Sequence, residues 1–243
     1  YNNNTINVTG DYGIGMRSEN ATGNIENKGK IESSKLRAVG MSASDGSNAV
    51  TNSRTIELSG QESIGLHTDN KGTAGHAVTN TGTITLVDAN DEDKPNIGIY
   101  SEHSSDVIVN NGKIEAGKNT LGIYGKAGGN ITLGASSETK VGDNGVAVFS
   151  TGGNINIANG AKLETGANNG VGVYYSGSNG TITNNTDKIT IGDKSFGFVI
   201  KGGTNNKFFS NSTGTVDLPD NSVYLYSADT TGTTSTVKNY TNL

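Results

Sequence analysis

A small residue between two apolar residues recurs at nearly constant spacing along the chain, and this repeat most constrains the fold. The first example, Ile14-Gly15-Met16, is followed by Val39-Gly40-Met41 and then by Ile64-Gly65-Leu66. The central positions are 15, 40, 65, 98, 122, 147, 172, 197 and 224, so the steps are 25, 25, 33, 24, 25, 25, 25 and 27 residues. Self-similarity with a fixed period of about 20–50 residues is typical of a solenoid.

Two further apolar anchors follow each central residue at constant offsets. Four of these pairs are Ile25 with Ile31, Val50 with Ile56, Ile108 with Ile114, and Ile157 with Leu163. Each unit therefore holds three short segments with the period-2 alternation of β-strands, bounded by Gly, Asn and Ser. We predict an all-β fold, a right-handed parallel β-helix of about nine 25-residue coils with three short strands per coil, as one domain over residues 1–243. The handedness follows the general behaviour of parallel connections.

The composition fits this architecture and excludes several classes of protein. Only 31% of the 243 residues are hydrophobic, but stacked coils align them into a thin continuous core and pair each backbone group with a neighbouring coil. The net charge is -5 and no basic run occurs, so we expect no nucleic-acid partner. No apolar stretch approaches the ~20 residues of a membrane helix. The absence of Cys excludes disulfides and thiol chemistry.

Asparagines recur two residues after the second apolar anchor of most units. Because Asn tolerates left-handed backbone and its amide can bond the Asn of the next coil, we predict an asparagine ladder at a corner. The alternative is a polar row that binds a ligand. Ala135 interrupts the series, whose members are Asn27, Asn52, Asn80, Asn110, Asn159, Asn184 and Asn211, with Asn239 continuing it.

Aromatic residues recur two positions after the central small residue. Strand alternation predicts that the flanking apolar residues point inward, and that the small residue and the second residue after it point outward. Four successive coils would then expose Tyr100, Tyr124, Phe149 and Tyr174 in one column beside a flat lane of small residues. One interpretation is a purely stabilising ladder of like residues. The other is a contact surface for sugars or a partner protein.

The 33-residue step carries two insertions, near 67–75 and near 87–95, and insertions in solenoids often form binding loops. The candidate binding residues there are His67, Asp69, Asp88, Asp91, Glu92 and Asp93. The spacing of Asp88, Asn90 and Glu92 allows a calcium loop, and a solvated acidic loop is the alternative. The histidines at 67, 76 and 103 occupy three different offsets, which argues against zinc. We expect no metal and no cofactor.

Catalytic motifs are weak in this sequence. The stretch Ser42-Ala43-Ser44-Asp45-Gly46 has the wrong order for a serine-protease nucleophile motif, and paired acids on neighbouring coils are sparse. We therefore expect a protein that is not an enzyme. The chain enters on the third face of a coil and neither end has a cap, so we expect a segment of a longer rod.

The repeated unit, as in Ile97-Gly98-Ile99-Tyr100 with Ile108-Val109-Asn110-Asn111-Gly112-Lys113-Ile114, resembles the passenger repeats of large Gram-negative autotransporter adhesins, and its Lys, Asn and Ile content is similar to that of fusobacterial outer-membrane adhesins. The resemblance implies a monomeric passenger on the bacterial cell surface, anchored to the outer membrane by a translocator barrel of the same parent chain. It implies attachment to a glycan or protein on host cells or other bacteria. The alternatives are a passive stalk for a distal binding domain and a polysaccharide-degrading β-helix enzyme.

Overall fold

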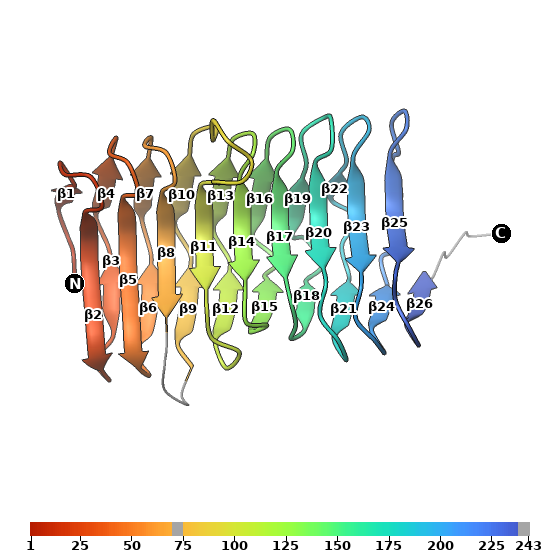
Figure 1. The fold of residues 1–243 in the computed structure, drawn as a ribbon, viewed down its shortest axis with the longest axis horizontal. Coiled ribbons are helices and arrows are strands. Elements are labelled where there is room, and N and C mark those ends of the chain that lie inside the picture. Colours follow the sequence, from red (N-terminus) through yellow and green to blue (C-terminus); the bar gives the residue numbers. More distant parts are fainter. Residues whose placement is uncertain (70–74, 238–243) are drawn as a thin grey trace.

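The computed structural model describes residues 1–69 and 75–237, which wind into one continuous β-solenoid (Figure 1). Adjacent coils pair in parallel in each of three sheets, as the strand registers show. Asn239 lies outside the described residues. The prediction of an all-β parallel β-helix with about nine coils and three strands per coil is confirmed.

The front sheet faces the viewer in Figure 1, and the other two sheets lie behind its upper and lower halves. Over the described residues, the front sheet contains nine strands: β2 (Ile14–Ala21), β5 (Val39–Gly46), β8 (Ile64–Asp69), β11 (Ile97–Ser101), β14 (Leu121–Gly125), β17 (Val146–Ser150), β20 (Val171–Tyr175), β23 (Phe196–Lys201) and β25 (Val223–Ala228).

The lower sheet follows the front sheet along the chain, and the upper sheet follows the lower sheet. The lower sheet contains β3 (Ile25–Asn27), β6 (Ala49–Asn52), β9 (Ala77–Asn80), β12 (Val107–Asn110), β15 (Asn130–Leu133), β18 (Ile155–Ile157), β21 (Thr181–Asn184), β24 (Lys207–Ser210) and β26 (Thr234–Val237). The upper sheet contains β1 (Thr5–Asn7), β4 (Lys30–Ser33), β7 (Thr55–Leu58), β10 (Thr83–Leu86), β13 (Lys113–Ala116), β16 (Glu138–Val141), β19 (Lys162–Glu164) and β22 (Ile189–Thr190).

The coil is right-handed, as predicted. In Figure 1 the front strands run downward and the strands behind them run upward, while the chain advances from left to right. A screw that turns and advances in this way is right-handed. This is the sense that parallel crossover connections adopt almost without exception.

Three inward-facing columns form the core, one from each sheet. In the upper sheet, for example, Ile31 pairs with Ile56 and Ile84 pairs with Ile114, and all four are fully buried. Leu163 belongs to this column, as expected. The assignment of Ile157 as an anchor of the lower sheet was wrong by two residues, because Ile155 pairs with Ile131 and Ile182 in that column.

A residue with left-handed backbone turns the chain into the front sheet in most coils. Three residues before the central position, φ lies between 54 and 59° at Tyr12, Arg37 and Glu62. Asn occupies the same place in later coils, as at Asn119 and Asn144 with φ of 54°. Asn adopts this conformation with less strain than other side chains that carry a Cβ. The backbone conformation of this corner is therefore the same in most coils, and the conformational strain it imposes depends on the residue that occupies it.

The asparagine ladder is confirmed over the first coils. Asn27 donates its amide to the side-chain oxygen of Asn52 at 2.9 Å, Asn52 donates to Asn80 at 2.8 Å, and Asn80 donates to Asn110 at 2.8 Å. All four side chains are fully buried. Asn2 joins the start of the ladder by donating to Asn27 at 2.8 Å.

Two members of the predicted ladder were assigned incorrectly. Asn159 lies in an exposed turn and Asn211 is also exposed. Leu133 and Ile157 fill the ladder column in the two coils between Asn110 and Asn184. The break therefore comes from apolar residues that continue the core at this corner, and not from Ala135.

The central small residue faces inward, which corrects the expected flat outward lane. In the last coil Tyr224 occupies this position, and its ring lies 5.3 Å from that of Phe198 inside the coil. A Cβ added to Gly40 would lie 2.6 Å from the carbonyl oxygen of Gly65 and 2.8 Å from Cγ2 of the core residue Ile56. The small residue therefore allows close approach of the next coil and of the core.

Candidate functional site

The inward turn of the central residue changes which residues the front sheet presents to solvent. The apolar residue before the small residue lies outside the core, and so does the residue two positions after it. Phe196 from the first set and Tyr226 from the second set touch across neighbouring coils, with ring centroids 6.1 Å apart. The front sheet thus carries two adjacent outward columns, an aliphatic column and an aromatic column, which we call together the front face.

The aliphatic column was missed by sequence reasoning, which placed its members in the core. Ile14 is 38% exposed, and most of the later members are partly exposed. Strand alternation failed here because two successive residues, the small one and the one after it, both face inward. Tyr224 was the signal in the sequence that could have revealed the orientation of the central position. A large side chain at a position that is otherwise Gly or Ala needs space, and in this coil the space lies inside the core. The column contains the aliphatic residues Ile14, Val39, Ile64, Ile97, Leu121, Val146, Val171 and Val223, and the aromatic Phe196.

The aromatic column forms a continuous stack of rings, as the sequence predicted. Tyr100 stacks on Tyr124 with ring centroids 5.3 Å apart, and Tyr124 stacks on Phe149 at 4.7 Å. Phe149 meets Tyr174 edge to face at 5.0 Å. His67 extends the stack on the other side and lies 5.4 Å from Tyr100. These side chains are half-buried, because each ring covers part of its neighbour.

The stacking leaves ring edges, rather than ring faces, open to solvent. The planes of Tyr100 and Tyr124 differ by 20°, and those of Tyr124 and Phe149 by 10°. Both faces of Tyr124 are therefore occupied by its neighbours. The column offers a partner its ring edges and its phenol hydroxyls, together with the aliphatic column beside it.

The upper sheet presents a contrasting face. Its outward residues are polar throughout and form exposed ion pairs, such as Lys113 with Glu115 at 2.6 Å and Lys140 with Glu164 at 2.6 Å. The outward side of the lower sheet is mainly polar, as in the paired residues Thr51 and Thr79, and its larger apolar members are Val107, Val109 and Phe209. The concentration of apolar and aromatic side chains on one outward face is therefore specific to the front sheet.

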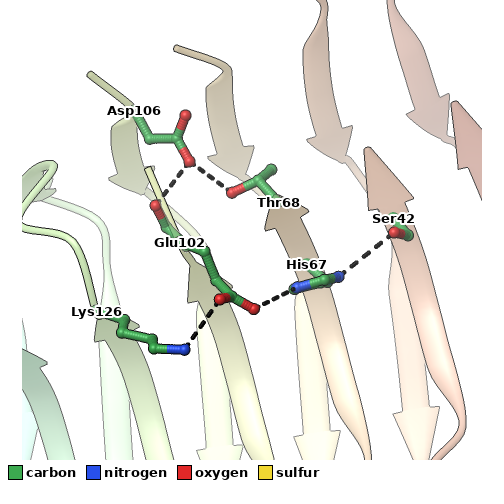
Figure 2. Close-up of polar contacts among 7 residues, drawn as sticks. Ser42, His67, Thr68, Glu102, Asp106 and Lys126 are labelled. Atoms are coloured by element: carbon green, nitrogen blue, oxygen red, sulfur yellow. Dashed lines mark hydrogen bonds and ion pairs between the residues drawn. The ribbon is translucent and has the colours of Figure 1, made fainter. Parts of the chain in front are cut away.

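A polar network borders the aromatic column near its N-terminal end (Figure 2). Glu102 binds His67 Nε2 through Oε1 at 3.3 Å and Lys126 Nζ through Oε2 at 3.0 Å. Burial raises the pKa of Glu102, but hydrogen bonds from Lys126 and His67 outweigh it and leave the pKa below its usual value. The neighbouring Tyr100 hydroxyl and the Glu102 carboxylate raise the pKa of Lys126. Burial raises the pKa of Tyr100.

A second polar network, which is buried, lies at the turn between the front and lower sheets. Asp106 is 1% exposed and its Oδ2 accepts hydrogen bonds from Thr68 and Ser101, each at 2.7 Å. Its Oδ1 accepts a hydrogen bond from the backbone N–H of His76 at 2.7 Å. Three donors compensate this buried carboxylate, so its role is to hold the turn between the front and lower sheets.

The candidate loop residues do not form one site. His67 and Asp69 lie in strand β8 and not in a loop, and residues 70–74 lie outside the described part of the chain. Asp88, Asp91, Glu92 and Asp93 lie in the segment between β10 and β11, which passes over the upper end of the front sheet, whereas β8 ends at the lower end (Figure 1). The acidic segment and the end of β8 therefore lie at opposite ends of the front strands.

The acidic insertion is organised by hydrogen bonds to the chain itself. Asp88 Oδ1 accepts the backbone N–H of Lys118 at 2.8 Å, and Asp91 Oδ1 accepts the backbone N–H of Asp93 at 3.0 Å. Among residues 1–69 and 75–237, no group of three or more His, Asp or Glu side chains is arranged to hold a metal ion. The same residues include no helix long and apolar enough to cross a membrane.

Comparison with known proteins gives a match to a protein family. Residues 1–120 match the family model described as the BigA third pectate lyase-like domain. No curated protein and no solved structure matches the chain. The likeness indicates a β-helix domain of a bacterial surface protein, with an extracellular or surface location. The matched stretch includes β2, β5, β8 and β11 of the front sheet, and with them Tyr100, His67 and Glu102. It ends before Lys126.

Proposed function

We propose that this chain is a segment of a bacterial surface adhesin that attaches to host cells or other bacteria through the front face. One observation carries the proposal: among the three sheets, as far as residues 1–69 and 75–237 describe them, only the front sheet exposes both an aliphatic and an aromatic column. A sheet face that serves only as a solvated wall would resemble the upper sheet, with its Lys and Glu pairs. Exposed apolar patches of this kind mark interaction sites.

The chemistry of the front face favours a protein partner. Sugars bind aromatic side chains mainly through the ring face, and the stacking of Tyr100, Tyr124 and Phe149 leaves ring edges exposed. Aliphatic side chains, ring edges and phenol hydroxyls are the groups that protein interfaces use at their centre. A glycan receptor is the other outcome that the experiment below distinguishes.

The resemblance of the repeats to autotransporter passengers supports a more specific proposal about how the chain is displayed. In this proposal the β-helix is a passenger displayed outside the cell and anchored by a translocator barrel of the same parent chain. The match to a bacterial surface-protein domain supports display at the cell surface, without specifying the anchor.

A passive stalk is the second candidate. The mutual stacking from His67 to Tyr174 favours it, because rings that cover each other's faces stabilise neighbouring coils without any partner. In that case the receptor-binding part would belong to another region of the parent protein.

Binding of the purified chain to host cells and to a glycan array tests the proposal. The comparison variant carries Tyr100→Ala, Tyr124→Ala and Tyr174→Ala, and its β-sheet circular dichroism reports the fold. We expect wild-type binding to cells, loss of binding in the folded variant, and loss of wild-type binding after protease treatment of the cells. Binding to glycans alone would identify a sugar receptor, and equal binding by the variant would refute the front face. No binding by either protein would favour the stalk.

A further inference from the structure

A shallow hollow of about 260 Å³ opens on the front sheet at the N-terminal end of the aromatic column. Ser42 and His67 form part of its lining, and Arg17 and Asp69 lie beside them. Arg17, Ser42 and His67 occupy the same outward position in β2, β5 and β8, so parallel pairing places them in consecutive coils. The hollow thus combines a hydroxyl, an imidazole and a guanidinium with the carboxylates of Glu19, Asp45 and Asp69 on one sheet.

Ser42, His67 and Glu102 form a connected relay (Figure 2). Ser42 Oγ lies 3.5 Å from His67 Nδ1, and His67 Nε2 lies 3.3 Å from Glu102 Oε1. The Ser–His contact is long, but such contacts in empty sites tighten when substrate binds. Ser42 is 6% exposed, so its hydroxyl lies at the floor of the hollow.

The partners of the His67 ring determine where its proton lies. An ionised carboxylate only accepts hydrogen bonds, so the ring nitrogen that faces Glu102 must carry the proton. In the neutral ring, Nδ1 then has a free lone pair directed at Ser42 Oγ, which donates its hydroxyl proton to it. Lys126 binds the other oxygen of Glu102 at 3.0 Å and keeps the carboxylate ionised. This is the order of groups that activates a serine nucleophile.

We propose that Ser42, His67 and Glu102 are a hydrolytic site for short-chain carboxylic esters, with Ser42 as nucleophile, His67 as general base and Glu102 as the positioning residue. The small, open hollow fits a short acyl group such as acetyl, attached to a larger alcohol that extends into solvent. This inference goes beyond attachment and does not depend on it. This proposal departs from the expectation that the protein is not an enzyme. That expectation rested on the order of residues within local motifs, whereas the three relay residues come from three stacked coils.

The chemistry is balanced by water alone. Ser42 Oγ attacks the ester carbonyl carbon and its proton moves to His67 Nδ1. The bond from that carbon to the alcohol oxygen breaks, and the alcohol leaves with the proton from His67. Water then attacks the acyl carbon and gives a proton to His67 Nδ1. The bond between that carbon and Ser42 Oγ breaks, His67 returns the proton to Oγ, and the carboxylic acid leaves. Ester and water thus become acid and alcohol, and no oxidant or other reactant is needed.

Arg17 is the group available to stabilise the negative oxygen of the tetrahedral intermediate. The backbone N–H groups of the front strands are used in pairing between coils, so they cannot supply an oxyanion hole. Arg17 binds Glu19 at 3.0 Å, and the remaining donors of its guanidinium are available to a bound substrate. Its side chain is 54% exposed, so it can turn toward a substrate in the hollow.

Hydrolysis of p-nitrophenyl acetate by the whole chain tests the proposal, together with covalent labelling by a fluorophosphonate probe. We expect Ser42→Ala and His67→Ala to lower the rate about 100-fold or more, and peptide mapping to place the probe on Ser42. Glu102→Gln should lower kcat at least about tenfold with little change in KM, a split that a purely structural role would not produce.

Two control variants separate the relay from nonspecific surface reactivity. Ser176→Ala removes a partly exposed serine that follows β20, and His103→Ala removes a partly exposed histidine outside the relay. Both should keep the wild-type rate, and circular dichroism should show that all variants are folded. A folded Ser42→Ala variant with the wild-type rate, or a probe adduct on residues other than Ser42, would overturn the proposal.

Discussion

The side-chain amide of Asn184 donates a hydrogen bond of 3.0 Å to the hydroxyl of Tyr224, inside the coil. Tyr224 stands where eight earlier coils have Gly or Ala, and Asn184 belongs to the buried asparagine column. The contact shows that the central position of the repeat faces the core. In the other coils this position is small because the next coil and the upper sheet occupy the space.

This crowding predicts that a branched side chain at Gly65 destabilises the rod. A Cβ at this position would lie 2.5 Å from the carbonyl oxygen of Gly98 and 2.8 Å from Cγ2 of Ile84. We expect Gly65→Val to lower the free energy of unfolding by about 1–3 kcal/mol, measured by chemical denaturation. Gly23→Val is the matched control, because no atom lies within 4 Å of its added Cβ. Equal losses in both variants would contradict the inward orientation.

The buried asparagine ladder predicts a large cost for removing one rung. Asn52 accepts from Asn27 at 2.9 Å and donates to Asn80 at 2.8 Å, and all three are fully buried. Asn52→Leu would leave a buried donor and a buried acceptor unpaired, which costs about 2–4 kcal/mol of unfolding free energy. Asn211→Ala is the control, because this exposed residue bonds Asn185 at the surface and its loss should change stability by less than about 0.5 kcal/mol.

The left-handed corner predicts a stabilising substitution. Lys194 has φ of 53°, and the equivalent residues of neighbouring coils include Asn144 with φ of 54° and Asn169 with φ of 61°. Since Asn tolerates this backbone better than Lys, Lys194→Asn should raise the free energy of unfolding by about 1 kcal/mol. Thermal unfolding would measure the gain. Lys188→Asn, at an exposed position with ordinary backbone, should give no gain, and a gain of equal size there would contradict the corner assignment.

The lowered pKa of Glu102 predicts that the folded protein loses stability in acid. Its pKa is lower in the folded protein than the 4.5 of a free glutamate, because the hydrogen bonds from Lys126 and His67 outweigh the effect of burial. The carboxylate therefore contributes stability that is fully present above about pH 4.5 and is lost as the pH falls through the folded pKa. Below pH 4.5 the unfolding free energy of wild type should fall more steeply than that of Glu102→Gln. Denaturation series between pH 3 and 7 would measure it, and parallel curves would contradict the interaction.

Much of this fold follows from spacing in the sequence. A 25-residue step places Ile31 beside Ile56 and a 24-residue step places Tyr100 beside Tyr124, since coils of nearly equal length align equivalent residues. The stacked aromatic column was therefore predictable. The asparagine ladder was predictable while the coils kept constant offsets, and failed at Asn159 because the coils between Asn110 and Asn184 place Leu133 and Ile157 in that column.

The composition of the front face was less predictable, for a physical reason. A glycine is compatible with an outward lane and with a tight inward contact, so Gly98 or Gly122 alone does not reveal the orientation. Strand alternation assumes that neighbouring residues point to opposite faces, and here the small residue and the next one both point inward. The Ser42, His67 and Glu102 relay was also missed, because its members come from three coils and their contacts depend on side-chain rotamers.

The most direct test of the front face as the attachment surface is site-specific photocrosslinking on host cells. A benzophenone amino acid would replace Tyr174 in the aromatic column in one protein, and Lys140 on the upper sheet in the other. The proposed function predicts that the probe at position 174 crosslinks to a cell-surface protein and that the probe at position 140 does not. Crosslinking from position 140 with none from position 174 would contradict attachment through the front face.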